Sequence, residues 1–407
     1  MIQIDKPRIE EKDNQVNLIS HIVNSLSNYE NDCYYVADIE YGKYFCDEVA
    51  DAFVVGMLIP AILSGQNIKI NAPMSEKIYY NLCHTVIYAL SRAFNLPAIK
   101  VMQKELIKAN YHPESVGTGC SLGIDSFSTI IEHTADNCPP SYKLTHLTFF
   151  NTGAYGEKNS QKAHNSYLNN LKMVKEFANE IKLPLVSIET NLPQFYDKCN
   201  IDFNQTGLLR NMSVVLTLQK LFKRYIYSSG YPLYKTQLSK TDLATMETFL
   251  LPSLSSESTE LVVGQPNLSR TEKAKMICDN NFVQNYLYVC CQDLVVNNDM
   301  HCGPWINLNK NKKRNCSHCD KCLRTILTLD ILGKLEKFDK VFDYSNKFLI
   351  RVLYMAKVIG LKKRNFFFKD VYNLAVQEKF KISFLARLLS VLYKFKIIDL
   401  YYSFHKS

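Results

Sequence analysis

Hydrophobic and polar positions in the middle of the chain follow two alternating patterns. Short apolar runs, which predict strands, are separated by longer segments whose apolar residues recur every three or four positions, which predicts helices. The predicted strands are residues 115–119, 144–151, 185–190 and 224–228. The predicted helices between them are residues 126–134, 164–181 and 206–222. Strands and helices that alternate at this spacing predict an α/β fold, a parallel sheet with helices on both faces.

The first hundred residues show a similar mixture of patterns. Residues 1–30 are polar, and we expect an irregular lead-in there. The elements predicted after it are a strand at 31–40, a helix at 45–63, a strand at 67–70, a helix after Ser75 and a strand at 98–102. We therefore expect an added N-terminal α/β domain over residues 1–110.

The last third of the chain is less regular. Residues 236–270 are rich in Ser and Thr and predict loops, and a cysteine-rich segment spans 290–322. The tail, residues 346–407, alternates apolar and basic positions and predicts helices. A packed helical cap is the favoured interpretation of the tail, and a helix on a membrane surface is the alternative. The middle domain then covers residues 111–345.

Composition narrows the class of protein. With 47% hydrophobic residues among 407, wholesale disorder is excluded. The longest apolar run, residues 52–63, contains Gly56 and Pro60 and is shorter than the roughly 20 residues of a membrane span. The charged N-terminus does not resemble a signal peptide, so we expect a cytoplasmic protein. The net charge of +9 weakly favours an anionic ligand without distinguishing nucleotide, nucleic acid and phospholipid.

The segment GTGCSLGIDSF, residues 117–127, joins the first strand of the predicted parallel sheet to a helix. Glycines let backbone N–H groups converge on phosphate oxygens, and a helix directs its positive end toward the same point. Ser121 and Ser126 add hydroxyl donors, and Asp125 could cap the helix or help to hold Mg²⁺. The segment therefore predicts a phosphate-binding loop, and an ordinary turn without a ligand is the alternative.

This loop resembles the SGGxDS signature of the PP-loop ATP pyrophosphatases, whose sheet is Rossmann-like. Ser121, Gly123, Asp125 and Ser126 match, and Leu122 stands where that family usually has Gly. A side chain at this position is tolerable if its φ is negative. The resemblance implies that ATP binds with its triphosphate on the loop, that a substrate oxygen attacks the α-phosphorus, and that pyrophosphate leaves. A nitrogen or sulfur nucleophile then displaces AMP.

The resemblance also implies roles for residues farther along the chain. Asn151 and Gly153, at the end of the second strand of the parallel sheet, are expected near the nucleotide; an ordinary glycine turn is the alternative. Arg270 and Lys273 could neutralise the departing pyrophosphate, or they could be solvated residues at a helix start. Glu272 could pair with either of them within one helical turn.

The chain has 13 cysteines, three of which form a C-x2-C-x2-C motif at Cys316, Cys319 and Cys322. In a cytoplasmic protein this spacing indicates a metal site, with tetrahedral Zn²⁺ first and an iron–sulfur cluster as the alternative. Spacing alone leaves the fourth ligand open. The upstream candidates are Cys290, Cys291, His301 and Cys302, and His318 lies within the motif. The motif resembles the zinc site of the 7-cyano-7-deazaguanine synthase family, where the upstream Cys closes a strand-like segment. That resemblance implies Cys290 as the fourth ligand and a structural role for the metal-binding segment 290–325.

Together the two motifs predict an ATP-dependent ligase that forms AMP and pyrophosphate. It would activate a carboxylate or amide-type substrate for attack by a nitrogen nucleophile, with ATP, Mg²⁺ and Zn²⁺ as cofactors. The acceptor would be a small molecule or a peptide, and a homodimer is compatible with the sequence. The alternatives are a tRNA-modifying or thiolating enzyme, for which nucleic acid is a less favoured partner, and a catalytically degenerate nucleotide-binding module.

Overall fold

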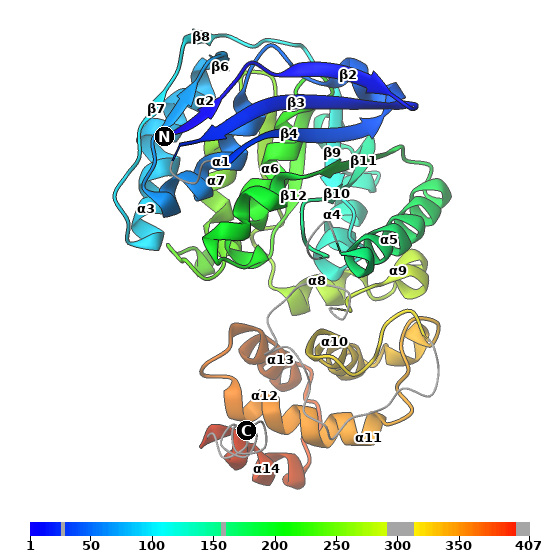
Figure 1. The fold of residues 1–407 in the computed structure, drawn as a ribbon. Coiled ribbons are helices and arrows are strands. Elements are labelled where there is room, and N and C mark those ends of the chain that lie inside the picture. Colours follow the sequence, from blue (N-terminus) through cyan, green and yellow to red (C-terminus); the bar gives the residue numbers. More distant parts are fainter. Residues whose placement is uncertain (26–28, 156–159, 291–312, 396–407) are drawn as a thin grey trace. The chain divides into compact units, whose positions relative to one another are not determined.

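The computed structural model describes residues 1–25, 29–155, 160–290 and 313–395 (Figure 1). These residues form two compact units, and each unit is described here by itself. The first contains residues 1–121 and 129–267. The second contains residues 122–128, 268–290 and 313–395. The helix α4, Ile124–Thr134, runs from one unit into the other.

The first unit is built on a mixed, mostly parallel sheet of 11 strands. The sheet begins with five parallel strands in spatial order: β13 (Glu260–Gly264), β12 (Phe222–Ser228), β9 (Ser115–Gly119), β10 (His146–Asn151) and β11 (Leu185–Thr190). It continues through β4 (Tyr29–Asp38), β3 (Gln15–Asn24), β1 (Ile2–Ile4), β5 (Ile68–Ile70) and β7 (Val101–Met102), and β2 (Arg8–Lys12) pairs with β3. The α/β class and all four strands predicted in the middle of the chain are confirmed.

Two expectations about strands were wrong. Residues 1–30 are not an irregular lead-in, because β1, β2 and β3 lie there. On β3, Val16, Leu18 and Ile22 are buried on one face together with Ser20, while Gln15, Asn17 and His21 lie on the other face. The β2–β3 hairpin turns at Asp13 and Asn14, both with positive φ, which these residue types tolerate. The strand β13 lies within the segment predicted to be loops, since Ser- and Thr-rich sequence flanks its five residues.

Helices cover both faces of the sheet (Figure 1). Neighbouring side chains on β10 show the two faces. Phe149 stacks on Tyr167 of α5 (Gln161–Glu180), with ring centroids 5.5 Å apart. Phe150 stacks on Tyr225 of β12 and belongs to the core that also contains α1 (Asp51–Ser64) and α6 (Gly207–Leu216). The prediction of helices on both faces is therefore confirmed.

The helix α1 is apolar on all sides and is buried for nearly its whole length, as expected for such a helix. It starts six residues later than predicted, and residues 45–50 before it form an irregular segment. Gly65 ends it with a φ of 64°, in the left-handed conformation that glycine favours. The N-terminal part of the first unit also contains α2 (Glu76–Asn81), α3 (Ile87–Phe94) and the small parallel sheet of β6 (Pro73–Ser75) and β8 (Glu105–Ile107).

The N-terminal strands extend the central sheet and do not form a sheet of their own. β4 pairs antiparallel with β11, placing Thr190 opposite Tyr35. Just beyond β11, the buried side chain of Asn191 accepts a hydrogen bond from Tyr34 N at 2.9 Å and donates one to Asp32 O at 2.8 Å. One hydrophobic core runs through the N-terminal strands and the parallel strands alike.

The second unit is helical, so the predicted C-terminal helical region is confirmed (Figure 1). Its helices are α8 (Arg270–Ile277), α9 (Asn281–Tyr286), α10 (Asp320–Ile331), α11 (Lys347–Leu349), α12 (Met355–Leu361), α13 (Phe366–Gln377) and α14 (Phe384–Lys394). The buried carboxylate of Asp330 on α10 accepts two hydrogen bonds from Arg351, at 2.5 and 2.8 Å. Within the described part of the chain, no helix is both long and apolar enough to cross a membrane.

Candidate phosphate loop and metal centre

The loop between β9 and α4 has the predicted form of a strand, a short turn and a helix. Its helix begins at Ile124, and the carbonyl of Gly123 accepts the first-turn hydrogen bond from Phe127 N at 2.9 Å. Ser121 is exposed just before the turn, and Ser126 is buried in the first turn of α4. The polar residues of the motif therefore lie at the start of a helix, where backbone N–H groups favour an anion.

The conformation of Leu122 does not meet the condition under which a side chain is tolerable there, a negative φ. Its φ is +58°, its side chain is buried, and its carbonyl accepts a hydrogen bond from Tyr288 N at 2.8 Å. This is the left-handed region, which costs a residue with a side chain about 1 kcal/mol and costs glycine almost nothing. The backbone at Leu122 thus adopts a conformation that suits Gly, the residue usual at this position in the signature that the loop resembles.

The charged residues in the first turn of α8 have different partners. Ser269 and Glu272 form a capping box, in which Ser269 N donates to the Glu272 carboxylate at 2.7 Å and Glu272 N donates to Ser269 Oγ at 3.4 Å. Glu272 therefore caps the helix and does not serve as the ion-pair partner suggested by spacing. Arg270 and Lys273 reach Asp125 instead.

Asp125 is the point at which the predicted catalytic residues meet. Arg270 Nε lies 3.3 and 3.1 Å from the two carboxylate oxygens, and Arg270 Nη2 lies 2.5 Å from Oδ2. Lys273 Nζ lies 3.6 Å from Oδ1, and its side chain is only 1% exposed. Arg270 and Lys273 share one turn of α8, and Asp125 lies 145 positions before Arg270 in the sequence. The structure thus brings all three residues together.

The charges around Asp125 counteract the effect of burial on its pKa. Burial by itself raises the pKa of the Asp125 carboxyl, but the cations of Arg270, Lys273 and Arg324 outweigh it and hold that pKa below its ordinary value. The carboxylate is therefore ionised at neutral pH. Three cations face Asp125, and Asp370 lies in a recess beside Arg270 and Arg324, so the local balance of charge is still positive, which suits an anionic ligand.

Arg270 also contacts residues for which the sequence predicted no role. The guanidinium groups of Arg270 and Arg324 both lie over the ring of Phe367, at 4.6 and 4.5 Å from its centroid. They line a shallow, open recess together with Thr271 and Asp370. Asp370 accepts hydrogen bonds from Thr271 N at 3.0 Å and Thr271 Oγ1 at 2.8 Å, which fixes α13 against the start of α8. Arg324 lies two residues after the cysteine motif, and nothing in the sequence connects Phe367 with it.

Asn151 and Gly153 lie in the first unit, at the end of β10. The Asn151 amide donates to the Glu189 carboxylate at 3.2 Å, across the β10–β11 pair. Gly153 has a φ of +101°, and a Cβ there would lie 2.8 Å from Arg210 Nη1. The backbone conformation by itself accounts for a glycine at position 153, and the expected nucleotide contact of both residues stays a prediction.

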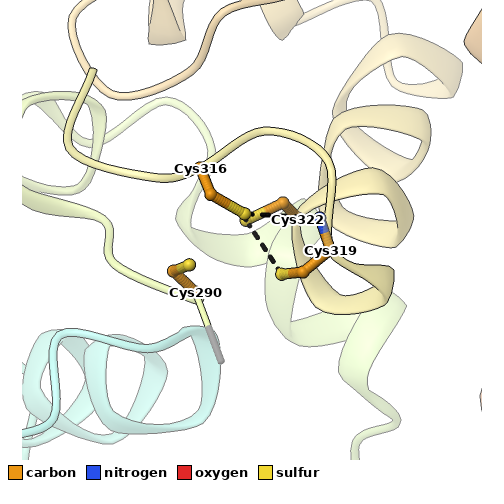
Figure 2. Close-up of side chains that lie close together, drawn as sticks. All are labelled: Cys290, Cys316, Cys319 and Cys322. Carbon is orange, nitrogen blue, oxygen red and sulfur yellow. Dashed lines mark hydrogen bonds between the residues drawn. The ribbon is translucent and has the colours of Figure 1, made fainter. Parts of the chain in front are cut away.

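Four cysteines of the second unit converge on one point, as Figure 2 shows: Cys290, Cys316, Cys319 and Cys322. All four sulfur atoms lie within 4.8 Å of one another. Cys322 Sγ is 3.7 Å from Cys316 Sγ and 3.4 Å from Cys319 Sγ. Four thiolates bound tetrahedrally to Zn²⁺ would have sulfur–sulfur separations of about 3.8 Å. The cluster could therefore hold a metal such as zinc.

Cys290 comes from one chain segment and the other three cysteines come from another (Figure 2). Asn315, which is buried beside the cluster, joins the two segments. Its amide Nδ2 donates to Leu287 O at 2.8 Å and to Val341 O at 3.1 Å, and its Oδ1 accepts from Val289 N at 2.8 Å. The segment expected to resemble a strand before Cys290 begins instead with the end of α9, and Asn315 holds its extended part. Of the other candidate ligands, Cys291, His301 and Cys302 lie outside the described residues. His318 is described, and its Nδ1 lies 2.7 Å from Cys316 O.

The four thiols are too close together to ionise independently. Hydrogen bonding from Cys290 raises the pKa of Cys316, burial raises that of Cys322, and hydrogen bonding to Cys316 lowers that of Cys290. A divalent cation would stabilise all four thiolates at once. Because four protein sulfurs complete a tetrahedron, such a site leaves no open position for substrate and suits a structural metal.

Comparisons with known protein families, with curated proteins and with solved structures gave no match. The candidate site therefore has to be interpreted from its own residues and geometry.

Proposed function

We propose that this protein is an ATP-dependent adenylating enzyme of the PP-loop type, which forms AMP and pyrophosphate. Its acceptor would be a carboxylate or an amide-type group on a small molecule or a peptide, activated for attack by a nitrogen nucleophile. The observation that carries the proposal is the position of Asp125. It lies in the first turn of the helix that follows the SxGxDS loop, and it pairs with Arg270 and Lys273.

The chain's own residues would act by positioning and by neutralising charge. The turn at Ser121–Ser126 and the start of α4 would bind the triphosphate. An acceptor oxygen would form a bond to the α-phosphorus, and the bond from that phosphorus to the bridging oxygen would break, with its electron pair leaving on pyrophosphate. Arg270 and Lys273 would stabilise the charge that develops on the leaving group, and Asp125 would hold both cations in place.

The residues around Asp125 do not fit a protein-held Mg²⁺. Both carboxylate oxygens already contact Arg270, and Lys273 approaches one of them. A hard dication at this carboxylate would have to displace those cations. We therefore assign Asp125 the orientation of Arg270 and Lys273 and derive no step through bound Mg²⁺.

The cysteine cluster fits Zn²⁺ in both donor type and spacing. Zinc bound there would supply a cross-link between residue 290 and residues 316–322. Since Tyr288, two residues before Cys290, donates to Leu122 O, this cross-link would support the segment that contacts the loop. The metal would thus act on the stability of the site and not on the reaction.

The test is to incubate the purified protein with ATP labelled in the α-phosphate, a nitrogen donor and a panel of carboxylates. AMP should appear together with pyrophosphate when a cognate acceptor is present. The Asp125→Asn and Arg270→Gln variants should lower AMP formation by about 100-fold. Asp136→Asn, which changes an exposed acid just after α4, should leave it unchanged. Formation of ADP with a cognate acceptor would contradict the mechanism.

One observation favours the alternative of a degenerate nucleotide-binding module. Leu122 places a buried side chain in the turn where the related signature has Gly. In that case the protein would bind ATP tightly and release no AMP with any acceptor in the panel. Equilibrium dialysis with ATP, performed beside the turnover assay, separates the two functions.

A further inference from the structure

We infer that α14 docks the protein on an anionic membrane surface, an interaction that does not depend on the proposed reaction. The helix packs on the rest of its unit through a narrow face. Ala386 and Ser390 are buried, and α12 approaches them at Gly360. A Cβ at Gly360 would lie 2.5 Å from Tyr393 Cβ and 2.7 Å from Ser390 O. The close contact positions α14 firmly on α12.

The opposite face of α14 is apolar and exposed. Its stripe of side chains recurs at helical spacing: Phe384, Leu385, Leu388, Val391, Leu392 and Phe395. Their exposure runs from 36% at Leu392 to 81% at Phe384, with Phe395 at 63%. Single exposed apolar residues are ordinary, but a continuous stripe of this kind marks a surface that something else covers.

The charge of the surrounding region identifies the kind of partner. Residues 346–395 contain 11 Lys and Arg residues and 2 acidic residues, a net charge of +9 that equals that of the whole chain. Both acids are engaged within the unit, Glu378 with Lys275 at 2.7 Å and Asp370 with Thr271. Three of the basic residues, Lys347, Arg351 and Lys357, form ion pairs with Asp330 and Asp320 of the same unit. The other eight leave the region positively charged, which suits an anionic partner.

Part of this charge borders the apolar stripe. Arg387 and Lys394 are exposed on α14 and lie on the same side of the stripe, about two helical turns apart. Arg364 Nη2 donates to Lys394 O at 3.2 Å, which brings a third basic residue, and the exposed Lys363 beside it, to the same end of the helix. Apolar side chains bordered by Arg and Lys are the pattern of a helix that lies in the membrane interface.

An anionic lipid surface fits this arrangement better than other partners do. The helix has 11 residues, too few to span a bilayer, so it would lie in the interface with the stripe at the acyl boundary. A second copy of the chain would bring two strongly positive regions together. Nucleic acid would match the charge, but four of the six stripe residues are aliphatic and offer no ring on which a base could stack.

The test is flotation of the full-length protein with vesicles of phosphatidylcholine alone or with added phosphatidylglycerol. Binding should require the anionic lipid and weaken in high salt. The double variants Phe384→Asp/Leu388→Asp and Arg387→Glu/Lys394→Glu should each lower partitioning by about tenfold or more. Val376→Asp, at an exposed apolar residue of α13 outside the stripe, should bind like the wild type.

Circular dichroism and melting temperature would establish that each variant is folded before its partitioning is compared. Failure of the wild type to float with anionic vesicles would overturn the inference. So would a dimer, measured by light scattering, that Phe384→Asp/Leu388→Asp abolishes. Binding to single-stranded RNA that the same variant leaves intact, with no binding to vesicles, would assign the positive charge to nucleic acid and also overturn it.

Discussion

The guanidinium of Arg270 contacts both carboxylate oxygens of Asp125, although the two residues are 145 positions apart in the chain. The side chains are 22% and 23% exposed, so the pair is neither fully solvated nor sealed from solvent. Planar, two-point contacts of this kind are a property of arginine that lysine cannot reproduce. The pair therefore sets the orientation of the guanidinium as well as its charge.

We expect the pair to stabilise the protein at neutral pH and to lose that effect in acid. The pKa of Asp125 is lowered in the folded state, so its contribution is present above the ordinary carboxyl pKa of about 4 and disappears as pH falls through the lower folded value. Asp125→Asn should lower the free energy of unfolding by about 1–3 kcal/mol at pH 7, and the difference should shrink toward pH 3.

Urea unfolding of the wild type and Asp125→Asn at several pH values measures this dependence. Asp279→Asn is a suitable control, because its carboxylate pairs with Lys334 and Lys337 at the surface and its effect should be small throughout. An Asp125→Asn difference that grows in acid would contradict the assignment of a lowered pKa.

Leu122 offers a test of backbone conformation. Because its φ is +58°, Leu122→Gly should be more stable than Leu122→Ala by about 1 kcal/mol, even though both lose the buried side chain. At Leu209, buried inside α6, the order should be reversed, with Gly less stable than Ala by about 1 kcal/mol. Thermal or urea unfolding of the four variants would show whether the difference in stability between the Gly and Ala variants has opposite signs at the two sites.

We expect the purified protein to contain about one zinc ion per chain, bound by the four clustered cysteines. Cys319→Ser and Cys322→Ser should lose the metal and lower the melting temperature. Cys83→Ser, at an exposed cysteine far from the cluster in sequence, should change neither. Metal analysis with a visible absorption spectrum measures this, and iron with sulfide-dependent absorption in place of zinc would contradict the choice of metal.

The hydrogen bonds of Asn315 hold the segment before Cys290 beside the other three cysteines, so we expect them to stabilise the metal site. Asn315→Ala leaves Leu287 O and Val289 N without this partner, and it should lower the free energy of unfolding by about 1–3 kcal/mol. Zinc transfer to a chromophoric chelator should also become faster. Asn285→Ala, which removes a contact with Lys340 nearer the surface, should leave the transfer rate unchanged.

Sequence patterns predicted the elements whose signals are local. The strands at 115–119 and 185–190 have the predicted bounds, since each is an apolar run between polar segments. The three cysteines of the motif lie within seven residues, so their convergence follows from spacing. The convergence of Cys290 with them rested on resemblance, because a long segment separates it from the motif.

Features that depend on tertiary contacts could not be predicted. The strands β2 and β3 were not predicted because polar residues are frequent in both. β2 is mostly exposed, and β3 has a partly exposed face that carries Asn17 and His21. Glu272 caps its helix because Ser269 takes the N-cap position, a choice that spacing alone does not decide. The meeting of Arg270, Arg324 and Phe367 depends on how helices distant in sequence pack together.

The antiparallel junction between β4 and β11 also bears on how the chain is synthesised. When β4 leaves the ribosome, the strand that will pair with it, together with Asn191, has not yet been translated. One side of the nascent N-terminal sheet would stay unpaired until about 150 further residues have emerged, a delay that invites association with other chains. Fragments ending near residue 110 should therefore aggregate on translation, whereas fragments extending beyond Asn191 should stay in the supernatant.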